Sequence, residues 1–303
     1  MEREKYNHLN KYLKEKFGER TLKICIDSGF TCPNRDGTVS TGGCIFCSEK
    51  GSGEHLSPTL SIQNQIEKHL NSYRGERANK FIAYFQNFTN TYDTLENLKA
   101  RYDSAISNEK IVALAIATRP DCITEEICKL LASYKNKVDV WVELGLQTSN
   151  DKTAALINRG YNSNKFTESM KLLNKYNIEV VTHIMVGLPG ETFDDIKETV
   201  NFLNKHDIQG LKVHSCYVVK NTRLAAMYEE GSYSPISLEY YIECASYILT
   251  HINPKIIIHK ISGDAPKDLL LAPEWNLHKK WILNGIDKYL NENNLYQGMY
   301  YEK

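Results

Sequence analysis

The chain has 303 residues, of which 42% are hydrophobic and 24% are charged, an ordinary globular composition with enough length for one large α/β domain and an appendage. A chain of this size can bury most of its apolar surface without disulfides or structural metals. Its 37 basic and 37 acidic residues cancel, which argues against a general binder of polyanions.

The N-terminal sequence, MEREKYNHLN, is charged and therefore unlike a secretory signal. No apolar run in the chain is long enough to span a bilayer. We therefore expect a cytoplasmic protein that makes no membrane contact. In that compartment eight cysteines indicate metal ligands or reactive thiols rather than a disulfide framework.

Basic residues gather in two places despite the zero net charge. Lys279–Lys280 ends a short basic stretch near the C-terminus, and a larger group lies near the N-terminus: Arg3, Lys5, Lys11, Lys14, Lys16, Arg20 and Lys23. Such groups are typical of solvated helix faces, and they also suit a surface that follows a phosphate backbone. Charge alone leaves both interpretations open.

Apolar, β-branched runs alternate with segments of helical spacing along the chain. The runs predict strands at Leu22–Ile26, Phe81–Phe85, Ile111–Ala117, Val138–Leu144, Glu179–Val186 and Gly210–Val213. The segments between them predict helices at Pro58–Tyr73, Thr124–Tyr134, Asn164–Tyr176 and Thr192–Lys205. This alternation indicates parallel βα units, and six units favour a partial, open (βα)6 TIM-like barrel of the α/β class. We expect a basic helical segment at 1–20, the barrel at 21–221 and a C-terminal α/β extension at 222–303.

Polar and turn-forming residues follow each predicted strand. Examples are Tyr84–Asn87, Thr118–Asp121 and Glu143–Thr148. The carboxyl ends of parallel strands converge on one face of a barrel, where barrel enzymes place their chemistry. Gly and Pro after a strand are also ordinary turn punctuation. Because six strands end in this way, we predict an active site at that face.

The first predicted strand leads into a loop with three cysteines, CPNRDGTVSTGGCIFC. Thiolates bind iron–sulfur clusters, and Cys32, Cys44 and Cys47 on one loop are suited to surround a cubane. Three ligands for four irons would leave one iron open. A zinc site completed by His55 is the alternative, although structural zinc sites usually pair two short ligand knuckles and only one is present. Buried thiols without a function are the third interpretation.

Longer motifs surround these cysteines. The chain contains, in order, DSGFTCPNRDG, GGCIFC, YFQNFTNTY, TRPDCI, ELGLQT, INRGY, GLPGET, YVVKNTRLAAMY, HKISGDAP and LLAPEW. This series, from about Tyr6 to Leu290, resembles elongator-type radical S-adenosylmethionine (SAM) proteins of the bacterial subgroup that includes the wobble-uridine enzyme MnmL. Ser215-Cys216 and Lys260 depart from the pattern expected for that subgroup.

The resemblance implies a cofactor pair and a substrate class. The pair is a [4Fe–4S] cluster on Cys32, Cys44 and Cys47 and SAM on the open iron, with an electron from a donor such as flavodoxin or ferredoxin. The substrate would be tRNA, with carboxymethylaminomethyl-uridine converted towards aminomethyl-uridine. Two alternatives are a radical SAM enzyme acting on a small molecule or peptide, and a zinc-stabilised RNA-binding module without chemistry.

The resemblance also implies roles for residues after the second and fourth strands. Gln86 and Asn87 occupy the place where radical SAM proteins hold the methionine amino group, and a turn hydrogen bond is the alternative. Glu143 and Gln147 would contact the ribose or the methionyl group. Arg159 would pair with the methionyl carboxylate, unless it forms a surface ion pair.

The later motifs imply further contacts. Gly187 to Gly190, with Pro189 between them, would let the backbone approach the adenine. Cys216 is a candidate donor of a hydrogen atom to a substrate radical. Arg119 and Asp121 belong either to the site or to a salt bridge that braces the barrel. Three histidines on apolar strands are expected to be hydrogen-bonded core residues: His183, His214 and His259.

Overall fold

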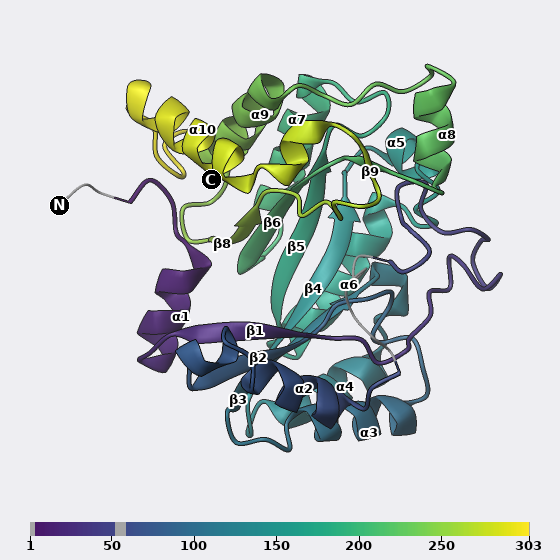
Figure 1. The fold of residues 1–303 in the computed structure, drawn as a ribbon, viewed down its shortest axis with the longest axis vertical. Coiled ribbons are helices and arrows are strands. Elements are labelled where there is room, and N and C mark those ends of the chain that lie inside the picture. Colours follow the sequence, from purple (N-terminus) through teal and green to yellow (C-terminus); the bar gives the residue numbers. More distant parts are fainter. Residues whose placement is uncertain (1–3, 52–58, 303) are drawn as a thin grey trace.

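Seven parallel strands form the central sheet of this computed structural model, which describes residues 4–51 and 59–302. The strand order is β1-β2-β3-β4-β5-β6-β8, so neighbours in the sheet follow one another along the chain (Figure 1). Arg3, His55 and Pro58 lie outside the described residues. The strands are β1 Thr21–Ile26, β2 Lys80–Phe85, β3 Ile111–Thr118, β4 Asp139–Gln147, β5 Glu179–Val186, β6 Gly210–Ser215 and β8 Ile257–Ile261.

Helices pack on the outer, convex face of this sheet. Alternate strand residues such as Ile24, Leu114 and Val142 face them and form one large core. Polar side chains start several helices, as where the Thr124 hydroxyl accepts a hydrogen bond from the Ile127 N–H. The main helices are α2 Ile62–Leu70, α3 Leu95–Ala105, α4 Glu125–Tyr134, α6 Ser163–Lys175, α7 Phe193–Asn204, α9 Leu238–His251 and α10 Lys279–Glu292.

Shorter elements connect these units. The short helices are α5 Asp151–Leu156 and α8 Arg223–Glu229, and the 3-10 turns are Gly75–Arg77, Pro120–Cys122 and Glu274–Leu277. A separate two-stranded antiparallel ribbon joins β7 Val218–Val219 to β9 Leu270–Ala272.

All six predicted strands are present, and the region expected as an extension adds a seventh. β8 pairs in parallel with β6, and α9 before it completes another βα unit. The sequence analysis places His259 on an apolar strand but predicts no bounds for it, because His259 and Lys260 interrupt the run Ile257–Ile261. β1 and β8 are the two edges of the sheet and are not paired with each other within the described residues, so the barrel is partial and open, as predicted.

Helix α1, Leu9–Phe17, closes the amino-end of the barrel between β1 and β8 (Figure 1). Leu13 packs against Ile82 and Trp141 on the inner, concave face of the sheet. Lys16 forms ion pairs with Asp139 and Glu179, the first residues of β4 and β5. The helix is therefore a plug that the sheet holds by apolar packing and by charge.

This placement corrects the interpretation of the N-terminal basic group as one continuous surface. Lys16 is engaged in the plug, and Lys23 points into the barrel, where its Nζ lies 2.9 Å from Glu143 Oε1. Lys11 pairs with Glu4 on the surface. Helical spacing in the sequence indicates which face of α1 carries the basic side chains. It does not indicate that this helix packs against the amino-end of the barrel, so the sequence does not reveal which of these side chains have partners inside the fold.

Candidate active site

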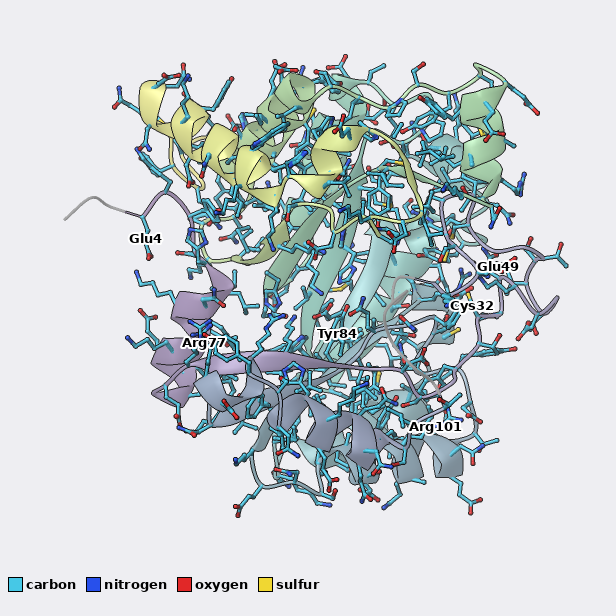
Figure 2. The ribbon with its side chains drawn as sticks, viewed as in Figure 1. Glu4, Cys32, Glu49, Arg77, Tyr84 and Arg101 are labelled. Atoms are coloured by element: carbon cyan, nitrogen blue, oxygen red, sulfur yellow. The ribbon has the colours of Figure 1, made fainter. Side chains whose placement is uncertain are left out.

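The cysteine loop leaves the carboxyl end of β1 and folds back through tight turns. The Arg35 N–H donates to the Cys32 carbonyl at 2.8 Å, and the Cys47 N–H donates to the Cys44 carbonyl at 3.0 Å. Gly43 has a φ of 76°, in the left-handed region that favours glycine. Figure 2 shows Cys32 on this loop. These turns bring the three thiols close enough for Cys44 to interact electrostatically with both Cys32 and Cys47.

The kind of ligand fits an iron–sulfur cluster, since three cysteines on one loop are typical ligands of such clusters. Among the described residues, no three His, Cys, Asp or Glu side chains converge on a point where they could share one metal ion. A cubane binds each thiolate at a different iron, so its ligand sulfurs stand further apart than those around one zinc. The zinc alternative also relied on His55, which lies outside the described residues.

The surroundings of Cys44 favour a metal-bound thiolate. Burial raises the pKa of the Cys44 thiol to about 12, so the free thiol is protonated at neutral pH. The buried Asn34 Nδ2 lies 3.7 Å from Cys44 Sγ and donates towards it. A positive iron centre would offset the cost of the buried thiolate, and the amide would add a hydrogen bond to the sulfur.

Unpaired acceptors lie next to this loop, in the segment that follows β2. The Thr89 N–H donates to the Thr31 carbonyl, which holds the segment against the residue before Cys32. Asn87 Oδ1, Thr89 Oγ1 and Asn90 Oδ1 are buried and have no hydrogen-bond partner among the described residues. Buried acceptors normally have a donor, so these atoms suit a ligand that carries N–H groups, such as an amino acid ammonium.

Two residues predicted to hold the methionine amino group lie in that segment. Asn87 is oriented by its Nδ2, which donates to Asp27 Oδ2 at 2.7 Å. Gln86 is half-buried directly after β2, and its N–H donates to the Ile26 carbonyl at 3.3 Å. Their place beside the cysteine loop is compatible with the predicted role, which stays a prediction.

Arg159 and Arg119 brace the loops above the sheet. Arg159 is fully buried, and its guanidinium donates to the carbonyl oxygens of Leu146, Thr148 and Tyr161. Arg119 forms a two-pronged ion pair with Asp121, at 2.9 and 2.7 Å, and donates to the Arg159 carbonyl. The structure therefore shows the internal salt bridge at Arg119. Arg159 also lies 3.5 Å from the half-exposed carboxylate of Asp151, so an ion pair accompanies its backbone contacts, and its contact with SAM stays a prediction.

The remaining predicted contacts lie at the ends of β4 and β5. Gln147 has a φ of 60°, and its Oε1 accepts from the Tyr161 hydroxyl at 3.1 Å. Gly187 has a φ of 90°, and its carbonyl accepts from the Tyr233 hydroxyl at 2.8 Å. Pro189 is buried. The turn at Gly187 needs its glycine, both turns are anchored by a tyrosine hydroxyl, and their contacts with SAM stay predictions.

Cys216 lies in an apolar environment. Its side chain is fully buried in a cluster with Ile45, Leu188 and Leu224, and burial raises the pKa of its thiol to about 12. These contacts give no support to a role as hydrogen-atom donor, because that role requires contact with the substrate. Cys122, Cys128 and Cys244 are buried, as expected of structural cysteines.

The inner face of the sheet holds an ion network that sequence reasoning did not predict. Glu143 lies in the middle of β4, and its carboxylate accepts from Lys23, Lys212 and His183. Burial alone would raise the pKa of Glu143, but Lys212 and Lys23 outweigh burial and hold that pKa well below its usual range. Because both carboxylate oxygens have cationic or histidine partners, the predicted contact of Glu143 with SAM would have to compete with them.

Glu191 offers a test of the GLPGET turn. Its Oε1 is buried without a hydrogen-bond partner among the described residues, and burial raises the pKa of Glu191 from 4.5 to about 7. Between pH 4.5 and about 7 the Glu191 carboxyl is protonated in the folded protein but ionised in the unfolded chain. The free energy of unfolding therefore falls as the pH rises through this range. Glu191→Gln should therefore stabilise the protein above pH 7 by about 2–3 kcal/mol, and urea denaturation measures the difference. A gain of the same size below pH 4.5 would contradict the assignment.

Two family models match this chain. Residues 32–203 match the Radical SAM superfamily, and residues 208–292 match the Radical_SAM C-terminal domain. The chain belongs to the Radical SAM superfamily. It is therefore a radical SAM enzyme whose cofactors are a [4Fe–4S] cluster and SAM. Among the described residues, no helix is both long and apolar enough to cross a membrane.

Three similar proteins illustrate the relationship. The protein YtqA of Bacillus subtilis is 38% identical over 301 residues, which cover 99% of this chain and 94% of YtqA. The tRNA uridine(34) acetyltransferase of Methanocaldococcus jannaschii is 28% identical over 199 residues, which are 63% of this chain and 35% of that relative. The solved structure of an N-terminally truncated Elp3 from Methanocaldococcus infernus has a TM-score of 0.69 at 20% identity and covers 91% of this chain and 64% of that one.

Proposed function

We propose that this radical SAM enzyme modifies the wobble uridine of tRNA and converts a carboxymethylaminomethyl substituent towards an aminomethyl one. The observation that carries the proposal is the similarity to an enzyme named for acting on tRNA uridine 34, which extends over 63% of this chain. The fold similarity to Elp3 is consistent with it.

The proposal assigns roles to the cysteine loop and to the segment after β2. Cys32, Cys44 and Cys47 hold the cluster, which when bound supplies the electron that cleaves SAM to the 5′-deoxyadenosyl radical. Asn87 and its neighbours accept from the SAM ammonium group, and the substrate approaches along the inner face of the sheet. The electron would come from a flavodoxin or a ferredoxin.

Contacts with the tRNA backbone would use localised basic residues. Lys279 and Lys280 are exposed at the start of α10 and are better candidates than Lys16 and Lys23, which have partners inside the fold.

Mass spectrometry of tRNA nucleosides from cells that lack the gene tests this function. We expect carboxymethylaminomethyl-uridine to accumulate and aminomethyl derivatives to disappear. Wild-type protein should restore the profile, and a Cys44→Ser variant, which lacks one proposed cluster ligand, should not. An unchanged nucleoside profile would instead favour a small molecule or a peptide as substrate.

A further inference from the structure

The inner face of the sheet carries more positive than negative charge. Lys23 and Lys212 both direct their ammonium groups to the one carboxylate of Glu143. Lys260 on β8, whose ammonium group pairs with Asp264, also acts on Lys212 and His214 but adds no unpaired charge. We call the following residues the inner cluster: Lys23, Glu143, His183, Lys212, His214 and His259.

Two histidines of the inner cluster have ring nitrogens without partners. His214 Nε2 and His259 Nδ1 are buried and accept or donate no hydrogen bond among the described residues. The ring of His214 lies 5.1 Å from that of His183, which is bonded to Glu143, and the ring of His259 lies 6.0 Å from that of Trp141. A buried polar atom without a partner is costly, so an arriving ligand oxygen would be stabilised here.

The inner cluster can be reached from outside, although it lies deep in the barrel. The side chains of Lys23, His183 and Lys260 keep 19%, 18% and 22% of their exposure. Glu143 precedes the end of β4 by four residues, which places the cluster about 13 Å below the carboxyl ends of the strands. Helix α1 packs between β1 and β8 at the opposite end of the barrel.

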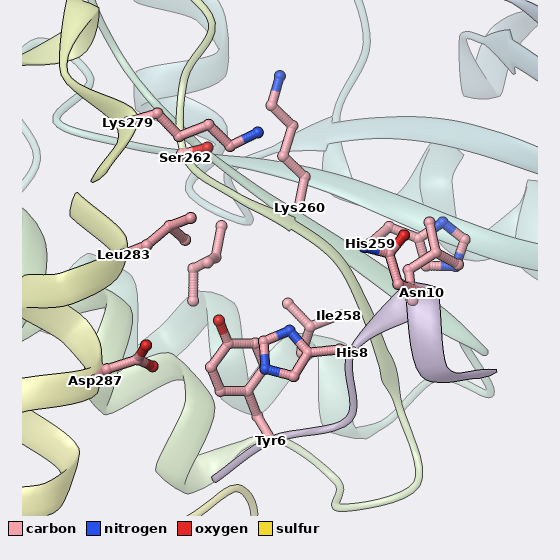
Figure 3. A pocket seen from close by; sticks show the side chains of 12 residues that line it. Tyr6, His8, Asn10, Ile258, His259, Lys260, Ser262, Lys279, Leu283 and Asp287 are labelled. Carbon is pink, nitrogen blue, oxygen red and sulfur yellow. The ribbon is translucent and has the colours of Figure 1, made fainter. Parts of the chain in front are cut away.

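A side pocket adjoins the same region. It lies between the N-terminal segment, β8 and α10, and His259 and Lys260 of β8 are part of its lining (Figure 3). Lys279 and Lys260 both approach Asp264, at 4.0 and 2.6 Å. The gap between the edges of the sheet is thus also lined by basic residues.

We propose that the inner cluster binds an anionic group of the substrate, and that this group is the carboxylate of the carboxymethylaminomethyl substituent. This identification of the anion rests on the proposed function. A cationic ligand would not suit the site, because Glu143 is already paired with two lysines and a histidine. A carboxylate would balance the excess positive charge and accept from the unpaired imidazoles.

The charge of Lys212 would respond to an anionic ligand. Burial lowers the pKa of Lys212 to about 7, although Glu143 opposes the effect. A second negative charge nearby favours the protonated form of the lysine, so ligand and lysine would stabilise each other.

Binding of two free nucleosides to the cluster-loaded protein with SAM tests the proposal. 5-Carboxymethylaminomethyl-uridine and 5-methylaminomethyl-uridine differ only by the carboxylate, and isothermal titration calorimetry measures both. We expect the wild type to prefer the carboxylate-bearing nucleoside by about 10-fold to 100-fold, the strength of one charge-assisted hydrogen bond. Lys23→Met should remove most of this preference.

Two further variants separate binding from folding. His214→Leu leaves the bonds of Glu143 intact, because His214 Nε2 has no partner among the described residues, and it should still weaken the preference. Lys16→Met is the matched control, since Lys16 is also an ion-paired lysine of this barrel but belongs to the plug. It should keep the full preference.

The outcomes distinguish this site from the proposed function. The proposed anion site is wrong if the wild type binds neither nucleoside or binds both equally well. It is also wrong if the preference for the carboxylate-bearing nucleoside survives in both Lys23→Met and His214→Leu. A variant-sensitive preference with an unchanged tRNA nucleoside profile in deletion cells would keep the anion site and reject the tRNA function. An altered tRNA nucleoside profile in deletion cells, together with equal binding of the two nucleosides, would keep the tRNA function and reject the anion site.

Discussion

Replacing Cys32, Cys44 and Cys47 together with Ala is expected to abolish both the iron–sulfur cluster and the cleavage of SAM. Anaerobically reconstituted wild-type protein should contain about four irons per chain if it holds one cubane. The three thiolates are the ligands proposed for that cubane, and Asn34 and the left-handed glycine at 43 shape the loop around them. Iron content, visible absorption and release of 5′-deoxyadenosine measure the loss.

Cys128→Ala is the matched control for this experiment. Cys128 is fully buried on α4 at the convex face of the sheet, so removing its thiol should leave iron content and SAM cleavage intact. A triple variant that retained a full cluster would show that other residues bind the iron.

Glu143→Ala is expected to destabilise the protein by about 3–5 kcal/mol, because it leaves buried ammonium groups without their counter-ion. The side chain of Glu143 is fully buried, and that of Lys212 keeps only 7% of its exposure. Urea denaturation at neutral pH measures the change. Because the folded pKa of Glu143 lies below its usual value of 4.5, the stability it contributes is present above that value and fades as the pH falls through the folded pKa.

Two comparisons make this prediction specific. Glu125→Ala also removes a carboxylate that accepts from two side chains, Lys175 and Tyr176, but this site is exposed, so the unfolding midpoint should not move appreciably. Glu143→Leu combined with Lys212→Met should recover part of the loss, because it removes both charges. If Glu143→Ala lowers the free energy of unfolding by less than about 1 kcal/mol, the prediction is wrong. Water would then hydrate Lys23 and Lys212 as it hydrates the lysine of an exposed ion pair.

The strands and helices of the barrel could be predicted because each has a local signal. A run such as Ile111–Thr118 is apolar on both faces, as in a strand covered by helices, and Thr124 marks the start of the helix that follows. The bounds and the pairing of the seventh strand could not be predicted in this way, although His259 is expected to lie on an apolar strand. His259 and Lys260 break its apolar pattern, and they are present because one side of β8 faces the polar interior of the barrel.

The cysteine loop could be predicted because its three ligands lie within one short stretch of chain. The inner cluster could not, because its members come from four strands besides β4 and meet only when the sheet curls. The sequence places Lys23 in a basic group and implies a contact with SAM for Glu143, and it gives no sign of the ion pair that joins these two side chains at 2.9 Å. A useful signal was available in the sequence: charged or histidine residues at inward positions of several strands.

The first and last parts of the described chain are fastened to each other. The Asn7 N–H donates to Gln297 Oε1 at 2.8 Å, the Gln297 N–H donates to the Lys5 carbonyl at 2.8 Å, and the Ile258 N–H donates to the Asn7 carbonyl at 2.8 Å. During synthesis Lys5 and Asn7 must therefore wait for Ile258 and Gln297, which are made much later, before these bonds can form. Until then α1 has no β8 beside it, and the barrel completes its amino-end only after β8 has been synthesised. Contacts so distant in sequence form slowly, so we expect closure of the amino-end to be a late step of folding.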